Sequence, residues 1–375
     1  MASWDIFCSV VDNYGDIGVT WRLARQLVAE HGQQVRLWVD DPQAFARICP
    51  QADAGVLRQW QAGVEVCRWL QPWPAVDAAD VVIEAFACEL PADHVAAMAR
   101  RQPASLWLNL EYLSAEDWVE GCHRLPSPQS GGLAKHFYFP GFTAATGGLL
   151  RERDLLARRD AWQADPQAQR AFLAGLGVKW GGERLISLFA YEQPRLAEWL
   201  DVLAGGEPTL LLVPEGRVLA DVQRWAGRSL AVGDSERRGT LRVQVIPFVS
   251  QDDYDRLLWC CDINAVRGED SFVRAQWAGR PFIWHIYPQD EQAHLDKLEA
   301  FMARYLQLAP AELAQSLRDF WLAWNAASGS VAPGEGWRAL EARMPAWREL
   351  AARWCAQQAA LDDLATGLVL FYPGS

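Results

Sequence analysis

The sequence predicts an α/β protein with two Rossmann-like domains, whose parallel sheets face each other across a cleft. Strand-like apolar runs alternate with amphipathic helical runs along most of the chain, which is typical of parallel sheets flanked by helices. A length of 375 residues exceeds what one hydrophobic core usually supports, so two domains are expected. The strand pattern also stops after residue 110 and restarts at residue 184, so that the same arrangement occurs twice.

The first half contains five expected strands and two clear helical patterns between them. The helical patterns cover 19–31 and 91–101, and the strands cover 4–10, 34–39, 64–69, 80–86 and 105–110. A Gly/Pro-rich excursion from Leu125 to Gly148 follows, and it carries Lys135, His136 and Tyr138. Loops of this length inside compact domains are more often functional than incidental, and the sequence leaves open what these three side chains contact.

The second half begins with a charged helical stretch at 150–175, and the strand pattern restarts after Gly181-Gly182. Helices dominate after residue 290, with a linker-like patch from Ser328 to Gly334 before the last ones. The expected strands are 184–190, 208–213, 241–247, 262–266 and 281–286. We therefore expect an N-terminal domain at 1–178 and a C-terminal domain at 179–356.

Composition excludes several classes of protein. The net charge of −12 leaves no Lys/Arg excess to neutralise phosphates, so neither a nucleic acid nor an anionic membrane is an expected partner. The beginning of the chain does not resemble a signal peptide, and no apolar run is long enough to span a membrane. The eight cysteines include no C-x-x-C pair and favour buried reduced thiols in a cytoplasmic protein, and the scattered histidines predict no metal site.

The most informative local feature is the first strand-to-helix turn, which places Asp12, Tyr14, Gly15 and Asp16 at the carboxyl end of the first strand. Ligands of open α/β sheets bind at such an edge, which makes the two aspartates candidates for chemistry. A structural alternative is that Asp16 only caps the helix and Asp12 only ends the strand in an Asx-turn. The turn lacks the G-x-G-x-x-G pattern, which weakens a dehydrogenase interpretation.

A second group of polar residues follows the strand at 262–266. A tight turn leads into a helix of about two turns, which we expect Asp270 or Ser271 to cap and Gly279 to end. The helix start and the charge of Arg267 together suit a diphosphate, and Glu269 and Asp270 suit sugar hydroxyls or support Arg267. The competing interpretation is a capped surface helix with a local Arg–Glu pair.

Aromatic residues end two more strands of the second half. Phe189 and Tyr191 follow the strand at 184–190, while Phe248 and Gln251 follow the strand at 241–247. Aromatic faces at these sheet ends could stack on a nucleobase, and packing within the core is the alternative for each ring taken alone.

These motifs resemble those of one family, the protein-arginine rhamnosyltransferases that modify bacterial elongation factor P. The resemblance covers essentially the whole chain. Its most specific parts are D-N-Y-G-D-I-G at 12–18, F-Y-F-P-G-F at 137–142, T-G-G-L-L-R-E at 146–152 and R-G-E-D-S-F-V-R-A-Q-W-A-G-R-P at 267–281. It implies an inverting GT-B glycosyltransferase that uses dTDP-β-L-rhamnose, needs no metal or other cofactor, and modifies one arginine of elongation factor P.

The resemblance also implies roles for individual residues. Asp12 and Asp16 would be the acceptor-side carboxylates, with Asp16 as general base, and Glu269 would join them as a catalytic residue. The donor would be bound by residues of both halves: Tyr14, Gly15, Phe189, Tyr191, Phe248, Gln251, Arg267, Gly268, Glu269, Asp270 and Ser271. The last helix, from about residue 357, would pack back on the first domain.

Two other functions remain open from the sequence. One is a GT-B transferase that uses another nucleotide sugar or a small acceptor. The other is a protein that binds a nucleotide sugar without turnover, against which the presence of Asp12, Asp16 and Arg267 argues.

Overall fold

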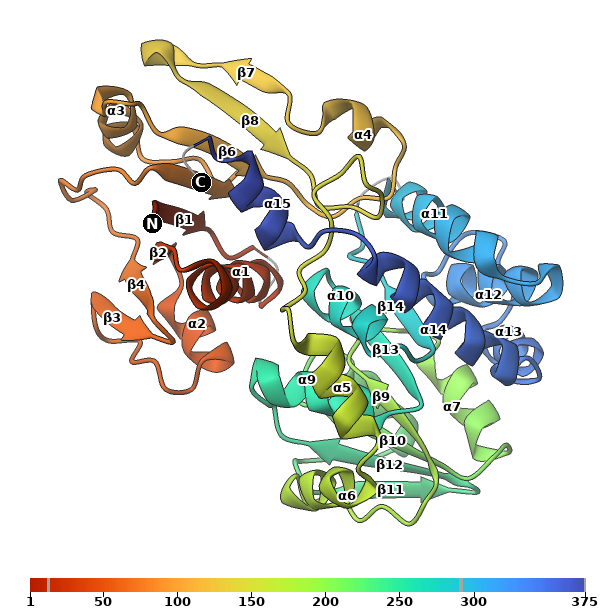
Figure 1. Ribbon diagram of the computed structural model, residues 1–375. Helices are drawn as coiled ribbons and strands as arrows, with labels where there is room; N and C mark the ends of the chain where they lie inside the picture. Colours follow the sequence, from red (N-terminus) through yellow and green to blue (C-terminus); the bar gives the residue numbers. More distant parts are fainter. Residues whose placement is uncertain (12–13, 290–292, 374–375) are drawn as a thin grey trace. The chain divides into compact units, whose positions relative to one another are not determined.

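The computed structural model describes residues 1–11, 14–289 and 293–373, and its chain divides into two compact units (Figure 1). The first unit comprises Met1–Arg153 with Gln358–Ser375, and the second comprises Asp154–Gln357. The sequence placed the boundary at 178/179, 25 residues later than the structure divides the chain. Each unit contains a mostly parallel β-sheet with helices on its faces, as in the predicted α/β fold class.

The first unit is built on a sheet of eight strands within the described residues, in the order β3-β4-β2-β1-β5-β6-β8-β7. All its strand pairs are parallel except β3 with β4 and β7 with β8. The strands are β1 (Ser3–Cys8), β2 (Gln34–Val39), β3 (Arg58–Gln61), β4 (Val64–Arg68), β5 (Val81–Ala85), β6 (Leu106–Leu110), β7 (Pro126–Pro128) and β8 (Ala134–Tyr138). The helices are α1 (Gly15–His31), α2 (Pro42–Ile48), α3 (Ala92–Arg100), α4 (Trp118–Cys122) and α15 (Leu364–Phe371).

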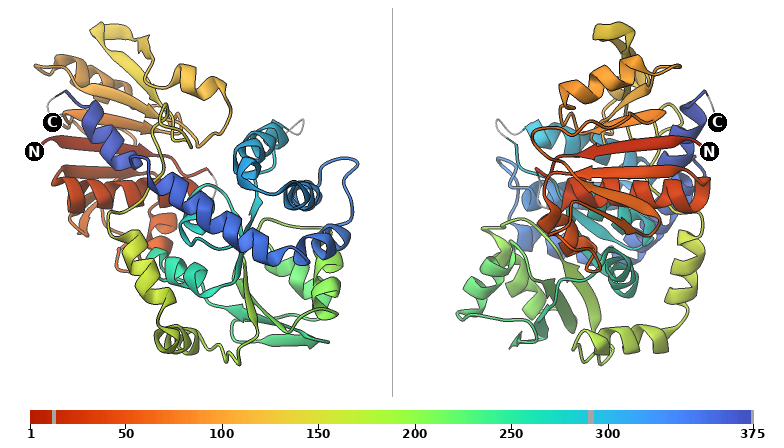
Figure 2. Two further views of the ribbon diagram at one scale, coloured as in Figure 1. Left: turned by 45° about the vertical axis from the view of Figure 1, so that its right-hand side comes forward. Right: turned by 90° about the vertical axis from the view of Figure 1, so that its left-hand side faces the viewer.

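The alternation of side chains along β1 explains how the helices cover both faces of this sheet (Figure 2). Trp4 contacts Tyr372, just beyond α15, which itself packs beside α1. Phe7 points to the other face, where it packs with Met98 of α3 and stacks on Trp38. Because both faces are covered, the strand is buried from Trp4 to Cys8 and reads as a nearly continuous apolar run.

The second unit has a sheet of six strands within the described residues, in the order β11-β12-β10-β9-β13-β14, with only β11 antiparallel to its neighbour. Its strands are β9 (Arg184–Leu188), β10 (Thr209–Pro214), β11 (Ser235–Arg238), β12 (Leu241–Ile246), β13 (Ile263–Arg267) and β14 (Phe282–His285). Its helices are α5 (Leu155–Gln163), α6 (Pro166–Gly175), α7 (Leu196–Ala204), α8 (Leu219–Ala226), α9 (Gln251–Cys260), α10 (Asp270–Trp277), α11 (Ala293–Tyr305), α12 (Ala311–Trp324), α13 (Pro333–Glu341) and α14 (Met344–Ala359).

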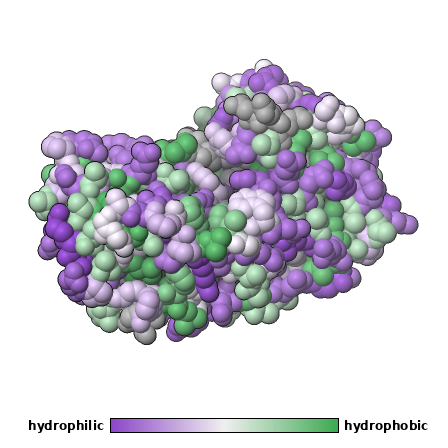
Figure 3. All heavy atoms as spheres, turned by 90° about the horizontal axis from the view of Figure 1, so that it is seen from above, coloured by the Kyte–Doolittle hydropathy of each residue, from purple (hydrophilic) through white to green (hydrophobic). Residues whose placement is uncertain are grey.

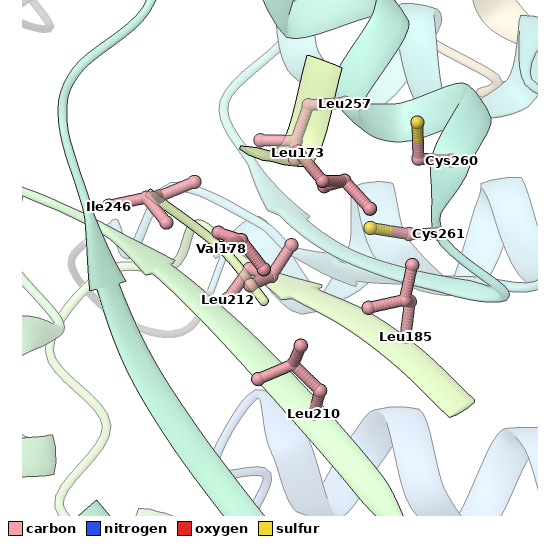
Figure 4. Close-up of a cluster of buried hydrophobic side chains, with 9 residues drawn as sticks. All are labelled: Leu173, Val178, Leu185, Leu210, Leu212, Ile246, Leu257, Cys260 and Cys261. Carbon is pink, nitrogen blue, oxygen red and sulfur yellow. The ribbon is translucent and has the colours of Figure 1, made fainter. Parts of the chain in front are cut away.

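The position of the boundary follows from the packing of α5 and α6. Leu173 of α6 belongs to a buried cluster with Leu257 of α9 and with Leu185, Leu210 and Leu212 of the second sheet (Figure 4). Trp162 of α5 packs on the same cluster and donates its indole N–H to Cys260 Sγ at 3.3 Å. The charged stretch at 150–175 therefore contributes apolar side chains to the core of the second unit, although it precedes the second strand pattern in the sequence.

The excursion at 125–148 differs from the expected long loop. Its residues form the hairpin β7–β8, and β8 extends the first sheet by pairing parallel with β6. Lys135 Nζ lies 3.4 Å from Glu84 Oε2, while Tyr138 is fully buried. The flanking glycines and prolines hid this strand, because its five residues are too few for a clear apolar alternation.

The C-terminal segment is held against the first unit by backbone and ring contacts. The Leu364 N–H donates to the Leu149 carbonyl at 3.0 Å, and the Phe371 ring meets His136 edge-on at 5.4 Å. Gly367 is required there, because a Cβ at this position would lie 2.6 Å from the Tyr138 hydroxyl oxygen.

Aromatic side chains and cysteines mainly fill the interior. Eight tryptophans are among the largest fully buried side chains: Trp4, Trp199, Trp277, Trp321, Trp324, Trp337, Trp347 and Trp354. All eight cysteines are free thiols, and six of them are buried. On the face drawn in Figure 3, hydrophilic and hydrophobic residues are interspersed.

Candidate functional site

The carboxyl edge of the first sheet gathers the loops that follow its central strands. Because β2, β1, β5 and β6 are parallel neighbours, Asp40, Val11, Phe86 and Tyr112 all follow strands that end at one edge. Of the residues predicted here, Tyr14 and Gly15 form the start of α1, with Tyr14 at its N-cap position. Asp12 lies outside the described residues.

Asp16 is a buried carboxylate in the first turn of α1, with 3% of its surface exposed. Its Oδ2 accepts the Val11 N–H at 2.9 Å, and its Oδ1 accepts the Tyr112 hydroxyl at 3.4 Å. The alternative that Asp16 merely caps the helix is wrong, because the N-cap position belongs to Tyr14. The carboxylate instead faces back across the loop that follows β1.

A second aspartate fixes the same loop from its other side. Asp40, which follows β2, accepts the Ser9 hydroxyl at 2.6 Å and the Val10 N–H at 3.0 Å. Residues 9–11 are thus held by a buried carboxylate on one side and an exposed one on the other. Both hold backbone N–H groups, but only Asp16 belongs to the helix start.

The carboxyl edge of the second sheet carries a cation packed on aromatic rings. The Arg267 guanidinium carbon, at the end of β13, lies 4.7 Å from the ring centroids of both Phe189 and Tyr191. Arg217, which follows β10, lies over the same Tyr191 ring at 5.3 Å. Phe189, Tyr191 and Arg267 are thus brought together, and Tyr191 is buried, as the alternative of packing within the core predicted for this ring. Their arrangement combines positive charge with aromatic faces, which are the groups that bind phosphates and bases.

The residues after β14 complete this cluster. His285 and Tyr287 meet Tyr191 edge-on, with centroid distances of 5.3 and 5.5 Å. Burial, together with the nearby Arg267 charge, lowers the pKa of His285 to about 3. The imidazole is therefore neutral at neutral pH, so that the arginines supply the positive charge here.

Glu192 pairs with Arg217, one of the two arginines of the cluster. It accepts a hydrogen bond from Arg217 Nε at 2.8 Å, and this bond holds the pKa of the carboxyl below its usual range. The pair orients Arg217 over the Tyr191 ring. Since Glu192 is half exposed in this pair, its main effect is on the orientation of Arg217 and not on stability.

The start of α10 differs slightly from the expected capping. The helix begins at Asp270, and Glu269 occupies the N-cap position without a side-chain capping bond, so neither Asp270 nor Ser271 is the cap. Gly268 adopts a left-handed φ of 63°, which a glycine tolerates and which makes the tight turn after β13 possible. Asp270 and Ser271 lie in the first turn of the helix.

Gln251 and Phe248 lie on the neighbouring connection. Gln251 begins α9, and its side-chain amide donates to Asp270 Oδ2 at 3.3 Å, which joins the starts of α9 and α10. Ser250 caps α9 by accepting the Asp253 N–H at 3.2 Å. Phe248 is half-buried in the loop before it.

Sequence reasoning missed five residues of the two clusters: Phe86, Tyr112, Arg217, His285 and Tyr287. Each ends a strand or follows one within a few positions, which is the signal that could have found them. No helix among the described residues is long and apolar enough to cross a membrane. In the same part of the chain, no three His, Cys, Asp or Glu side chains are grouped so that they could hold a metal ion.

Comparison with known proteins gives matches over nearly the whole chain. Residues 4–373 match the family described as Elongation-Factor P (EF-P) rhamnosyltransferase EarP. The chain is 64% identical to the protein-arginine rhamnosyltransferase of Pseudomonas aeruginosa, covering 99% of both chains. It is 45% identical to the protein of the same name from Shewanella oneidensis, covering 98% of this chain and 97% of that one.

Solved structures agree with these sequence matches. A structure described as the basis for EarP-mediated arginine glycosylation of translation elongation factor EF-P is 46% identical, covers 100% of both chains and has a TM-score of 0.71. A glycosyltransferase from Rickettsia africae is only 9% identical, covers 99% of this chain and 98% of its own, and has a TM-score of 0.53. The second likeness concerns the fold alone, and it is the glycosyltransferase fold that the sequence predicted.

Proposed function

Because the chain belongs to the EarP family of elongation factor P rhamnosyltransferases, we propose that it transfers L-rhamnose from dTDP-β-L-rhamnose to one arginine side chain of elongation factor P. The reaction is a single displacement that inverts the anomeric carbon. The observation that carries the donor side is the Arg267 guanidinium, which packs on the rings of both Phe189 and Tyr191. A nucleoside diphosphate needs positive charge and aromatic surface together, and this cluster offers both.

Asp16 is the proposed general base. A guanidinium is a weak nucleophile, because its lone pairs are delocalised and it stays protonated in proteins. A carboxylate that accepts one of its N–H bonds both holds the group and polarises it. As the C–N bond forms, the carboxylate takes the proton. The two hydrogen bonds to Asp16, from Val11 and Tyr112, support this role because they fix its orientation.

Asp12 is proposed as the second acceptor-side carboxylate. It lies four residues before Asp16 in the sequence. Two carboxylates neutralise a cationic guanidinium better than one, and an acidic protein suits such an acceptor. Glu269 is proposed as the catalytic carboxylate on the donor side, where it occupies the N-cap position of α10.

The leaving group is dTDP, which gathers negative charge as the glycosidic bond breaks. Arg267 and the N–H groups at the start of α10 would stabilise that charge. Phe189, Tyr191, Phe248 and Gln251 would bind the base and ribose, while Asp270 and Ser271 would contact the sugar and the diphosphate. Tyr14 and Gly15 are proposed as donor contacts from the first unit. The reaction as proposed uses no metal ion.

Mass spectrometry tests the proposal directly. Elongation factor P is incubated with this protein and dTDP-β-L-rhamnose, with and without an excess of chelator. We expect one deoxyhexose increment on one arginine-containing peptide, formed at the same rate under both conditions. An elongation factor P variant with lysine at that arginine is the control and should stay unmodified. The absence of an increment on the unaltered acceptor would contradict the proposed function.

Donor identity is tested separately, by the change in tryptophan fluorescence as nucleotide sugars are added. dTDP-β-L-rhamnose should bind more tightly than UDP-glucose. Equal affinities would contradict the dTDP assignment and would favour a transferase for another nucleotide sugar. Tight binding of dTDP-rhamnose without turnover on any acceptor would instead favour a non-catalytic binding protein.

A further inference from the structure

Tyr112 enters the proposed mechanism only through its hydrogen bond to Asp16, and the mechanism assigns no role to its ring. It lies two residues after the end of β6, is 36% exposed, and donates its hydroxyl hydrogen to Asp16 Oδ1 at 3.4 Å. Its ring is stacked on Phe86, with centroids 4.6 Å apart and an angle of 19° between the planes. One side of the ring is thus covered by Phe86, and the residue retains an accessible surface beside the Asp16 carboxylate.

Phe86, whose ring stacks on Tyr112, lies in a backbone segment of unusual conformation. Phe86 and Ala87, directly after β5, have φ values of 57° and 56°, a left-handed conformation that residues with a Cβ rarely adopt. The Phe86 N–H donates to the Leu110 carbonyl at 2.7 Å, and the Ala87 N–H donates to Asn109 Oδ1 at 3.2 Å. Strain of this kind persists only where surrounding bonds impose it, and it gathers at functional sites.

From these contacts we propose that Tyr112 is an acceptor-positioning and specificity residue. Its hydroxyl orients the Asp16 carboxylate, and its ring, supported by Phe86, is the flat surface against which the planar guanidinium of the acceptor arginine lies. The inference rests on the proposed function, since it assigns a surface for the acceptor of that reaction. A guanidinium stacks on an aromatic face and an ammonium does not match it in shape, so the ring favours arginine over lysine.

The hydroxyl and the ring have separable effects. A hydrogen bond donated to an ionised carboxylate stabilises the charged form and lowers its pKa, so loss of the hydroxyl raises the pKa of Asp16. Loss of the supporting ring weakens stacking of the acceptor and leaves the carboxylate bond in place. The first change should appear in kcat and its pH dependence, and the second in KM for the acceptor.

Two variants test the two effects. Tyr112→Phe keeps the ring and removes the hydroxyl. We expect kcat to fall about tenfold, KM for elongation factor P to stay the same, and the acid limb of the pH profile to move to higher pH. Phe86→Leu keeps the hydroxyl and weakens the stack. It should raise KM for elongation factor P about fivefold without moving the acid limb.

Trp60→Leu is the matched control, since Trp60 is an aromatic residue of the same unit, is 65% exposed and lies on β3, an edge strand separated from β1 by β4 and β2. It should behave as the unaltered protein. Melting temperature and dTDP affinity are measured for every variant and should not change, because Tyr112 and Phe86 are both partly exposed. If Phe86→Leu does not fold, the pH profile of Tyr112→Phe decides alone.

The possible failures are distinguishable. If the unaltered protein transfers no rhamnose, the proposed function is wrong. If it does transfer rhamnose while Tyr112→Phe retains its kcat and acid limb, this inference is overturned and the proposed function stands. An unchanged KM in a folded Phe86→Leu variant would overturn the stacking part. A loss of dTDP affinity in either variant would show a merely structural role and would also overturn the inference.

Discussion

At the scale of single residues, Asp16 is the group on which the chemistry depends. Asp16→Asn keeps the size of the side chain and one acceptor oxygen, so we expect the free energy of unfolding to fall by only about 1 kcal/mol. Turnover should fall about 100- to 10,000-fold, since an amide cannot take the proton. Rates of transfer to elongation factor P and urea denaturation measure the two effects.

Asp40→Asn is the control for this variant. Asp40 holds the same loop through Ser9 and Val10 but is exposed and has no proposed chemical role. Its replacement should leave turnover close to that of the unaltered protein. If both variants lost activity equally, the effect of Asp16→Asn would have to be attributed to the loop, and the base assignment would be wrong.

Arg267 provides the corresponding test on the donor side. Arg267→Lys keeps the charge and loses the planar group that lies against Phe189 and Tyr191. The dissociation constant of dTDP should rise about tenfold, which a fluorescence titration measures. Arg228→Lys, at an exposed pair with Glu236, should leave it unchanged. Equal affinities of Arg267→Lys and the unaltered protein would remove Arg267 from the donor site.

His285 gives stability a pH dependence with a definite sign. The folded protein keeps this side chain neutral down to a pKa of about 3, whereas the unfolded chain takes up a proton near its ordinary pKa of 6.5. The stabilising contribution is therefore complete above about pH 6.5 and is lost as the pH falls toward 3. Between about pH 8 and pH 5.5 the unaltered protein should lose ~1.4 kcal/mol more stability than His285→Asn. Equal losses in urea denaturation would contradict this.

A site residue could be identified from the sequence where a local pattern indicates its role, and not where its role depends on contacts with distant residues. Arg267 and Phe189 were predictable because charged and aromatic residues at a strand end, before a helix start, are a local pattern. Tyr112 and Arg217 also follow strands, but their meaning comes from partners distant in the chain, Asp16 and Tyr191. Their place after a strand could have marked both residues as candidates, but no local pattern contains these contacts, which only the folded sheet edge reveals.

At the scale of elements, α9 and α10 are joined by a buried ion pair between Asp255, in the middle of α9, and Arg274, in the last turn of α10. Arg274 Nη2 lies 2.6 Å from Asp255 Oδ2, and both side chains are nearly inaccessible. The same two helices begin at Gln251 and Asp270, which are hydrogen-bonded to each other. The ion pair and this hydrogen bond thus hold together the two helices whose starts belong to the proposed donor site.

Breaking this pair from one side should be costly. Arg274→Met leaves the Asp255 charge buried, and we expect the free energy of unfolding to fall by about 3–5 kcal/mol. The double variant Asp255→Leu, Arg274→Met should recover most of that loss, because no charge remains buried. Arg318→Met, at an exposed pair with Glu299, should cost less than about 1 kcal/mol. A cost of Arg274→Met no larger than that of Arg318→Met in urea denaturation would contradict the interpretation.

Elements were predictable where a strand is buried and mostly apolar, as for β1 and for β10, in which residues 210–213 are consecutive apolar side chains. The hairpin β7–β8 was not, because short strands between glycines and prolines carry little periodicity. Helices α5 and α6 were expected as helical, but the sequence does not record which core their apolar side chains join. Leu173 and Trp162 show that this is decided by tertiary packing.

At the scale of the whole molecule, the second unit is one continuous segment with its own sheet and buried cluster (Figures 1 and 4). All proposed donor residues except Tyr14 and Gly15 belong to it. The first unit needs two separate parts of the chain, since residues 358–375 complete it. The two units therefore differ in whether they can be produced as a single fragment.

We expect a fragment of residues 154–357 to fold cooperatively and to bind dTDP with nearly the affinity of the full chain, because the Arg267 cluster lies wholly within it. It should transfer no rhamnose, since Asp16 is absent. Circular dichroism and a fluorescence titration with dTDP measure both properties. Arg267→Lys in the fragment should weaken dTDP binding by the same factor as in the full chain, which separates specific binding from binding to a loosened fold. A folded fragment without affinity for dTDP would mean that donor binding requires the first unit, and Tyr14 and Gly15 would then be the residues to test.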